Sequence, residues 1–136
     1  MRPLLLLCAA VACNAADPAA LTDEGGQLAQ QQRYEEAIAK WQQALSIKPD
    51  FFPAAFNLGL HYYSTKNLDR ARDFLERAAA ASPQDFNSRY LLGATLSRLG
   101  KTDEALRQWR VAESLQPKNV KLLQLMVVEY QKGRYF

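Results

Sequence analysis

The sequence repeats itself with a period of 34 residues, and this repetition constrains the fold more than any other feature. Five series of residues follow the period: three prolines (Pro49, Pro83, Pro117), three glycines (Gly25, Gly59, Gly93), two alanine series (Ala37, Ala71, Ala105 and Ala44, Ala78, Ala112) and one bulky series (Trp41, Leu75, Trp109). Five series in one register do not arise by chance. We therefore divide the chain into repeats 18–51, 52–85 and 86–119, followed by a half repeat, 120–136.

Each repeat has the apolar spacing of two helices. Leu58 and Tyr62 share the face of one helix, and Ala71, Leu75 and Ala78 share the face of the next at i, i+4 and i+7. The prolines fall between repeats, where they stop a helix. Three polar residues are expected to cap helix N-termini: Asn67, Thr102 and Asn119. The pattern predicts an all-α chain.

These motifs resemble the tetratricopeptide repeat, with Leu-Gly at 58–59 and 92–93, Tyr62 three residues after Gly59, and Ala-x3-aromatic/Leu-x2-Ala before the proline. The resemblance covers residues 18–136. It implies a right-handed α-solenoid of three 34-residue helix-turn-helix repeats plus a C-terminal helix, working as a non-catalytic protein-interaction module. The first repeat departs most, because Glu24 replaces the usual Leu and Gly26 follows Gly25. Its first helix is expected to be the least stable.

In this family the first helices of the repeats line a concave groove that binds peptides. The resemblance therefore implies these groove residues: Phe56, Asn57, Leu60, Tyr63, Asn87, Tyr90, Arg98, Lys121 and Lys132. Such a groove is aromatic in the middle and basic toward its C-terminal end, which suits a peptide with an apolar anchor and an acidic group. Packing between repeats is an equally good interpretation of Phe56, Leu60 and Tyr90.

Some members of the family hold a C-terminal carboxylate in a clamp of Lys, Asn and Arg residues. The matching positions here are Thr22, Gly26, Asn57, Asn87 and Leu91, of which only Asn57 agrees. We therefore do not expect this kind of clamp.

Charge is uneven along the chain. Residues 17–50 hold three basic and six acidic side chains, whereas residues 51–136 hold thirteen basic and eight acidic ones. The C-terminal half can steer an acidic partner, although a solvated helical surface gives the same pattern. The formal charge of the whole chain, +3, is too small to indicate nucleic acid.

Residues 1–16 have the features of an export signal peptide: one positive charge, an apolar run and small residues. The run is shorter than the roughly 20 residues that a membrane-spanning helix needs. Three alternatives stay open: cleavage after Ala15, a lipobox-like site that makes Cys13 a lipidated first residue, and an uncleaved anchor. We expect a periplasmic or secreted protein, or an outer-membrane lipoprotein that touches the membrane only through its lipid.

Residues 120–130 predict one helix, and its expected core residues are Leu123, Met126, Val127 and Tyr130. Leu122 and Leu125 stand where the second repeat has Ala54 and Asn57, so we expect them to widen an apolar end face. Such a face needs a cover: a second copy, a partner, or further repeats. Two alternatives to groove binding follow, namely an assembly subunit of a bacterial envelope complex and a fragment of a longer repeat array.

No catalysis, metal or cofactor is expected. The single histidine, His61, lies three residues before Ser64 on one predicted helix, but nothing in the sequence supplies an orienting group or a pocket. The two cysteines, Cys8 and Cys13, belong to the export signal. An enzyme would have to depend on His61.

Overall fold

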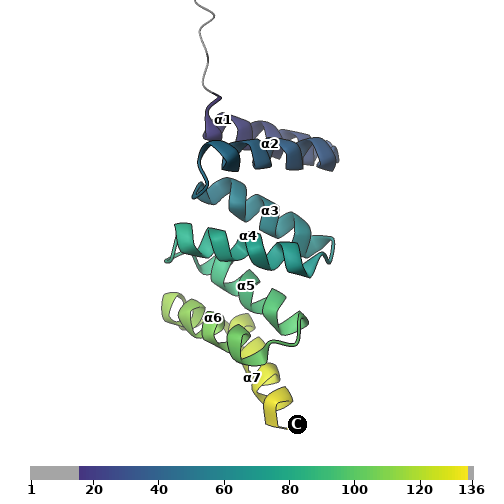
Figure 1. The fold of residues 1–136 in the computed structure, drawn as a ribbon. Helices are drawn as coiled ribbons and strands as arrows, with labels where there is room; N and C mark the ends of the chain where they lie inside the picture. Colours follow the sequence, from purple (N-terminus) through teal and green to yellow (C-terminus); the bar gives the residue numbers. More distant parts are fainter. Residues whose placement is uncertain (1–15, 135–136) are drawn as a thin grey trace, which may run out of the picture.

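The computed structural model describes residues 16–134, which form seven helices and no strand. The helices are α1 (Pro18–Gln30), α2 (Tyr34–Ile47), α3 (Phe52–Ser64), α4 (Leu68–Ala81), α5 (Phe86–Arg98), α6 (Thr102–Leu115) and α7 (Val120–Arg134). They stack as successive pairs along one axis, with α1 and α2 at one end and α7 at the other (Figure 1). The predicted all-α solenoid of three helix pairs plus a C-terminal helix is confirmed. The expectations for residues 1–15 lie outside the described residues.

Side-chain caps begin three of the helices. Asp17 accepts a hydrogen bond from the backbone N–H of Ala19 (3.1 Å), and Asp85 accepts one from that of Ser88 (2.7 Å). The Asn119 side chain accepts one from the N–H of Leu122 (3.0 Å), as expected for a cap. Asn67 also occupies the expected N-cap position, that of α4, but its side chain makes no capping hydrogen bond. The expectation for Thr102 is wrong, because Thr102 is the first residue of α6 and Lys101 is the N-cap.

The turn inside each helix pair contains one residue in the left-handed region, and these three residues are again 34 apart. They are Gln32 (φ 63°), Lys66 (φ 62°) and Gly100 (φ 76°). Only the third is a glycine, which adopts this conformation without a steric penalty. The turn geometry is therefore common to all three pairs although its sequence varies.

The glycine series marks the closest approach within each pair. A methyl group on Gly25 or Gly93 would overlap the indole of Trp41 or Trp109, and one on Gly59 would stand 2.7 Å from the Leu75 side chain. The two indole N–H groups also donate to the opposite helix, Trp41 to the carbonyl of Thr22 (3.2 Å) and Trp109 to that of Tyr90 (3.0 Å). Glycine on the first helix and a large side chain on the second thus fit as one unit.

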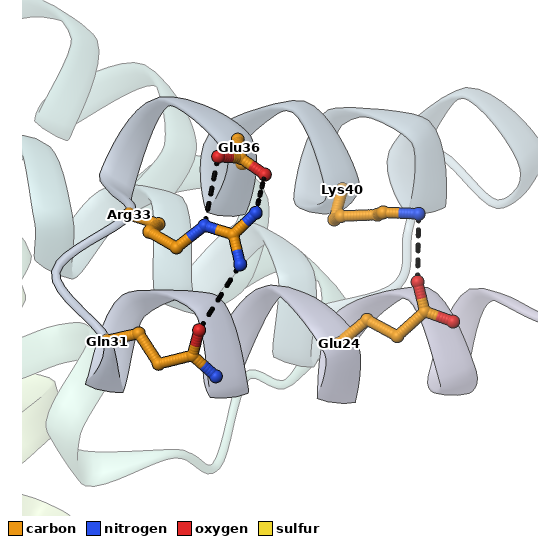
Figure 2. A network of polar contacts seen from close by, with 5 residues as sticks. All are labelled: Glu24, Gln31, Arg33, Glu36 and Lys40. Atoms are coloured by element: carbon orange, nitrogen blue, oxygen red, sulfur yellow. Dashed lines mark hydrogen bonds and ion pairs between the residues drawn. The ribbon is translucent and has the colours of Figure 1, made fainter.

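The buried side chains form two clusters. The larger one runs from Leu21 in α1 to Ala105 in α6, and the smaller one joins α6 to α7 through Leu106, Trp109, Ala112, Leu122 and Met126. At the opposite end, α1 and α2 are also linked by exposed polar contacts: Lys40 pairs with Glu24, and Arg33 contacts both Glu36 and Gln31 (Figure 2). Both ends of the solenoid therefore combine apolar packing with polar contacts between helices.

Candidate functional site

The first helices of the pairs form one continuous face, because α1 contacts α3 and α3 contacts α5. We call the exposed side of α1, α3, α5 and α7 the inner face. Each groove residue expected from the sequence lies on α3, α5 or α7. Their contacts separate them into packing residues and accessible ones.

Phe56 and Tyr90 serve mainly in packing. The Phe56 ring lies 5.7 Å from that of Phe52 and packs against the larger core cluster. Tyr90 makes the equivalent contact with Phe86, at 5.7 Å, and packs against the smaller cluster. Both rings are half-buried, so they support the inner face more than they are free to bind a ligand.

Tyr63 and Arg98 meet across the inner face. The guanidinium of Arg98, on α5, lies over the ring of Tyr63, on α3, at 4.6 Å from the ring centroid. This is a close cation–π geometry, and it joins two predicted residues that are 35 positions apart in the chain. Arg98 is exposed, so its charge is accessible to a ligand.

A cleft of about 300 Å³ opens where α1, α2 and α3 meet. Its lining residues are Gly26, Ala29, Tyr34, Trp41, Asn57, Leu60, His61 and Ser64. Leu60 is 42% exposed there, and a side chain at Gly26 would meet nothing within 4 Å. The rings of Tyr34 and His61 lie 5.4 Å apart. The sequence predicted Asn57 and Leu60 as groove residues. It did not predict Tyr34, which lies on a second helix, or His61, which was considered only for catalysis.

The C-terminal part of the inner face carries two predicted lysines in different states. Lys121 is exposed, whereas the ammonium of Lys132 is paired with the carboxylate of Glu129 at 3.0 Å. Asn87 is also exposed and makes no side-chain hydrogen bond in the described structure. Lys121 and Arg98 are therefore the predicted cations best placed to meet an acidic ligand.

Glu129 is a buried carboxylate that the sequence did not point out. Only 1% of the residue is exposed, and its carboxylate accepts hydrogen bonds from the hydroxyls of Ser97 (2.7 Å) and Thr102 (2.9 Å). Burial alone would raise the pKa of Glu129, but the bonds from Ser97, Lys132 and Thr102 outweigh it and hold the pKa below its ordinary value. The 34-residue register offers a signal, since Gln27, His61 and Thr95 at the equivalent positions are all polar.

The prediction that Leu122 belongs to an exposed apolar end face is wrong. This side chain is 0% exposed and belongs to the α6–α7 core cluster, and Leu125 packs against the same cluster. The reason is visible in the repeat register: Ala54 and Ser88, the equivalents of Leu122, are also fully buried against the preceding helix pair. Two expected core residues, Val127 and Tyr130, are instead 55% and 43% exposed.

The described residues show little support for catalysis. The Ser64 hydroxyl donates to the backbone carbonyl of His61 (2.7 Å), which leaves it outside any base–nucleophile pair with the imidazole. Residues 16–134 contain no group of three or more His, Cys, Asp or Glu side chains arranged to hold a metal ion. Over the same residues, no helix has the length and apolar character needed to cross a bilayer.

The paired helices and the glycine–tryptophan contacts define a tetratricopeptide-type solenoid. A sequence model of the family described as "Tetratricopeptide repeat" matches residues 28–94. Tetratricopeptide repeat protein 33 of Mus musculus is 31% identical over 102 residues, which cover 75% of this chain and 39% of that protein. Its Homo sapiens counterpart is 32% identical over 99 residues, covering 73% and 38%. The chain thus spans about two fifths of the length of these relatives.

Two solved structures share the arrangement. MamA of AMB-1 has a TM-score of 0.81 and 29% identity, over 90% of this chain and 68% of that one. The first tetratricopeptide repeat domain of Spaghetti (RPAP3), bound to an HSP90 peptide, has a TM-score of 0.77 and 21% identity, over 85% and 92%. The chain belongs to the tetratricopeptide repeat family.

Proposed function

We propose that this protein is a non-catalytic interaction module that binds a peptide or a partner helix on its inner face. The observation that carries the proposal is the exposed Arg98 guanidinium over Tyr63, which shares α3 with the cleft residue Leu60. Arginine and tyrosine are the side chains most often found as anchors of protein interfaces. Membership of a family of interaction modules supports the proposal, as does a solved structure of the same fold bound to a peptide.

The chemistry of the face suggests the ligand. The cleft of about 300 Å³ has room for one apolar side chain, and its base at Gly26 is open. Arg98 and Lys121 offer exposed cations on α5 and α7, farther along the same face. We therefore propose a ligand that places an apolar side chain in the cleft and an acidic group near Arg98 and Lys121. Both kinds of contact then form together.

Capture of partners by the immobilised full chain tests this proposal. Arg98→Ala and Tyr63→Ala are expected to lose the partner, because each removes half of the exposed pair. Arg77→Ala is the matched control, since its guanidinium lies over the ring of Phe74 (5.6 Å) on α4, away from the inner face. Equal recovery by wild type, Arg98→Ala and Arg77→Ala would reject the inner face as the binding surface.

We also propose that the module works outside the cytoplasm after residues 1–16 have directed its export. The support is the composition of that segment alone. The mass of the mature protein distinguishes the alternatives: cleavage after Ala15 leaves Ala16 first, whereas a lipid on Cys13 adds acyl chains that Cys13→Ser removes. Intact Met1 in the exported fraction would indicate an uncleaved anchor.

A further inference from the structure

The glycine series stops at α7. Positions 25, 59 and 93 are glycines, each in contact with a large side chain of the helix that follows, but position 127, the next in the register, is Val127. Because even one methyl group on those glycines would stand closer than 3.0 Å to the partner side chain, a valine excludes that contact. A helix that packs on α7 cannot present Trp or Leu as α2, α4 and α6 do.

The face around Val127 is nevertheless shaped to receive a helix. Val127 and Tyr130 are 55% and 43% exposed, and a cleft of about 610 Å³ lies between α6 and α7. Leu106 of α6 and Tyr130 of α7 line this cleft, with Arg110 and Arg134 at its margin. We call this surface the α7 cleft. It is lined by residues of α6 and α7, whereas the cleft used in the proposed function is lined by residues of α1, α2 and α3.

The free charges that line the α7 cleft are two arginines, Arg110 and Arg134, and one exposed carboxylate, Asp103, which leaves one positive charge in excess. Arg110 donates to the hydroxyl of Tyr130 (2.9 Å), which is a neutral partner. Glu129, at the same cleft, is already bonded to Ser97, Thr102 and Lys132. The excess positive charge of the cleft favours an acidic helix over a second copy, which would bring the same net charge to the contact.

We infer that the α7 cleft binds an amphipathic helix of a partner protein that presents Gly, Ala or Ser to Val127 and acidic side chains to Arg110 and Arg134. The small residue is required because Val127 occupies the space that the glycines leave free in the three earlier pairs. An apolar helix face laid into a groove is a common mode of recognition.

Extension of the full chain gives a direct test. Phe136 is in register with Thr102, 34 residues earlier, so a copy of residues 103–116 added after Phe136 supplies a helix at high effective concentration. Two extensions are compared, one keeping Trp at the position copied from Trp109 and one carrying Ala there. Both extensions are added to the wild-type chain and to the Val127→Gly variant. The Tm of each extended chain is compared with that of the same chain without an extension.

The proposal expects a crossed result. On the Val127 chain the Ala extension raises Tm by roughly 5 °C and the Trp extension does not. On Val127→Gly the Trp extension gives the larger rise. Equal rises with Trp on both chains, or no rise with any extension, would overturn the inference.

Two further arms test the charge and the occupant. The Ala extension contains two arginines copied from Arg107 and Arg110, and both are replaced by Glu. This change should raise Tm further at low salt but not at about 1 M salt, because charges are screened there. No gain at low salt would overturn the acidic requirement. Light scattering of the unextended chain should show a monomer, and a dimer abolished by Val127→Glu would assign the cleft to a second copy instead.

Discussion

Within residues 16–134, α1 and α7 each pack on other helices on one side only, and their open sides differ in chemistry. In α1, Asp23 and Glu24 stand in the register where α5 has Leu91 and Leu92, so the outer side of the first helix is polar. Glu24 extends to Lys40 of α2 rather than into a core (Figure 2). Acidic side chains at these two positions suit a helix face that is exposed to water.

The last helix keeps its apolar register. Met126 stands at the position of Glu24 and is buried against α6, while Val127 and Tyr130 remain exposed on the side that would face a further helix. The charged group of α7, Glu129, is turned inward and satisfied. Helix pairing and solvation of an end are therefore set by different positions of the same repeat, so they can be altered separately.

The largest expected effect is the loss of a tryptophan that joins a pair. Trp109→Ala should lower the free energy of unfolding by about 3–5 kcal/mol, because it empties the site between Gly93 and the α6–α7 cluster. Hydrogen exchange should show lost protection in α7 while α1 keeps its own. Trp41→Ala is the matched variant for the other end and should expose α1 first. An unchanged melting curve for Trp109→Ala would contradict the packing described here.

Glu129 should give the next largest effect. Glu129→Gln keeps the shape and removes the charge that Ser97, Thr102 and Lys132 bond, so it should cost roughly 1.5–3 kcal/mol at neutral pH. Because the folded-state pKa is lowered, this contribution is complete above the unfolded pKa of about 4.3 and is lost as pH falls through the folded value.

Denaturant titrations from pH 7 to pH 2 measure this contribution. The stability difference between wild type and Glu129→Gln should shrink in the acidic range, and Glu24→Gln, at the exposed end, serves as the control with a much smaller cost at pH 7. A difference that stays constant down to pH 2 would mean that the charge of Glu129 does not hold α7.

The sequence predicted the pairing better than the ends. The period of 34 and the glycine, alanine and tryptophan series are sufficient for the seven-helix solenoid, because they record contacts that recur in every repeat. Leu122 is predicted wrongly because its apolar character is considered without the burial of its register position, where Ala54 and Ser88 are buried. Val127 is exposed although Gly25, Gly59 and Gly93 at the same register position are buried, because no second helix covers α7 within residues 16–134. The contacts of Tyr63 with Arg98 and of Tyr34 with His61 join different repeats and leave no periodic trace.

The adjacent glycines of α1, Gly25 and Gly26, allow two effects to be tested separately, namely the packing of α1 on α2 and the helix propensity of the residue. Gly25→Ala should lose about 1–3 kcal/mol, because its methyl group overlaps Trp41. Gly26→Ala meets nothing within 4 Å and should gain up to about 1 kcal/mol, because alanine favours a helix over glycine. Thermal unfolding of the two single variants measures both. Equal shifts in the same direction would show that the pair does not pack at Gly25.

The smallest expected effect is that of the exposed ion pair at the polar end. Glu24 and Lys40 are 2.8 Å apart, with side chains 52% and 37% exposed, so a double-mutant cycle should give about 0.2–1 kcal/mol, decreasing with salt. Glu129 and Lys132 make a similar contact, 3.0 Å, but their carboxylate is buried, and their coupling should be larger and less sensitive to salt. A coupling at Glu24–Lys40 equal to that at Glu129–Lys132 would show that solvent exposure of the acid does not set the strength of these two ion pairs.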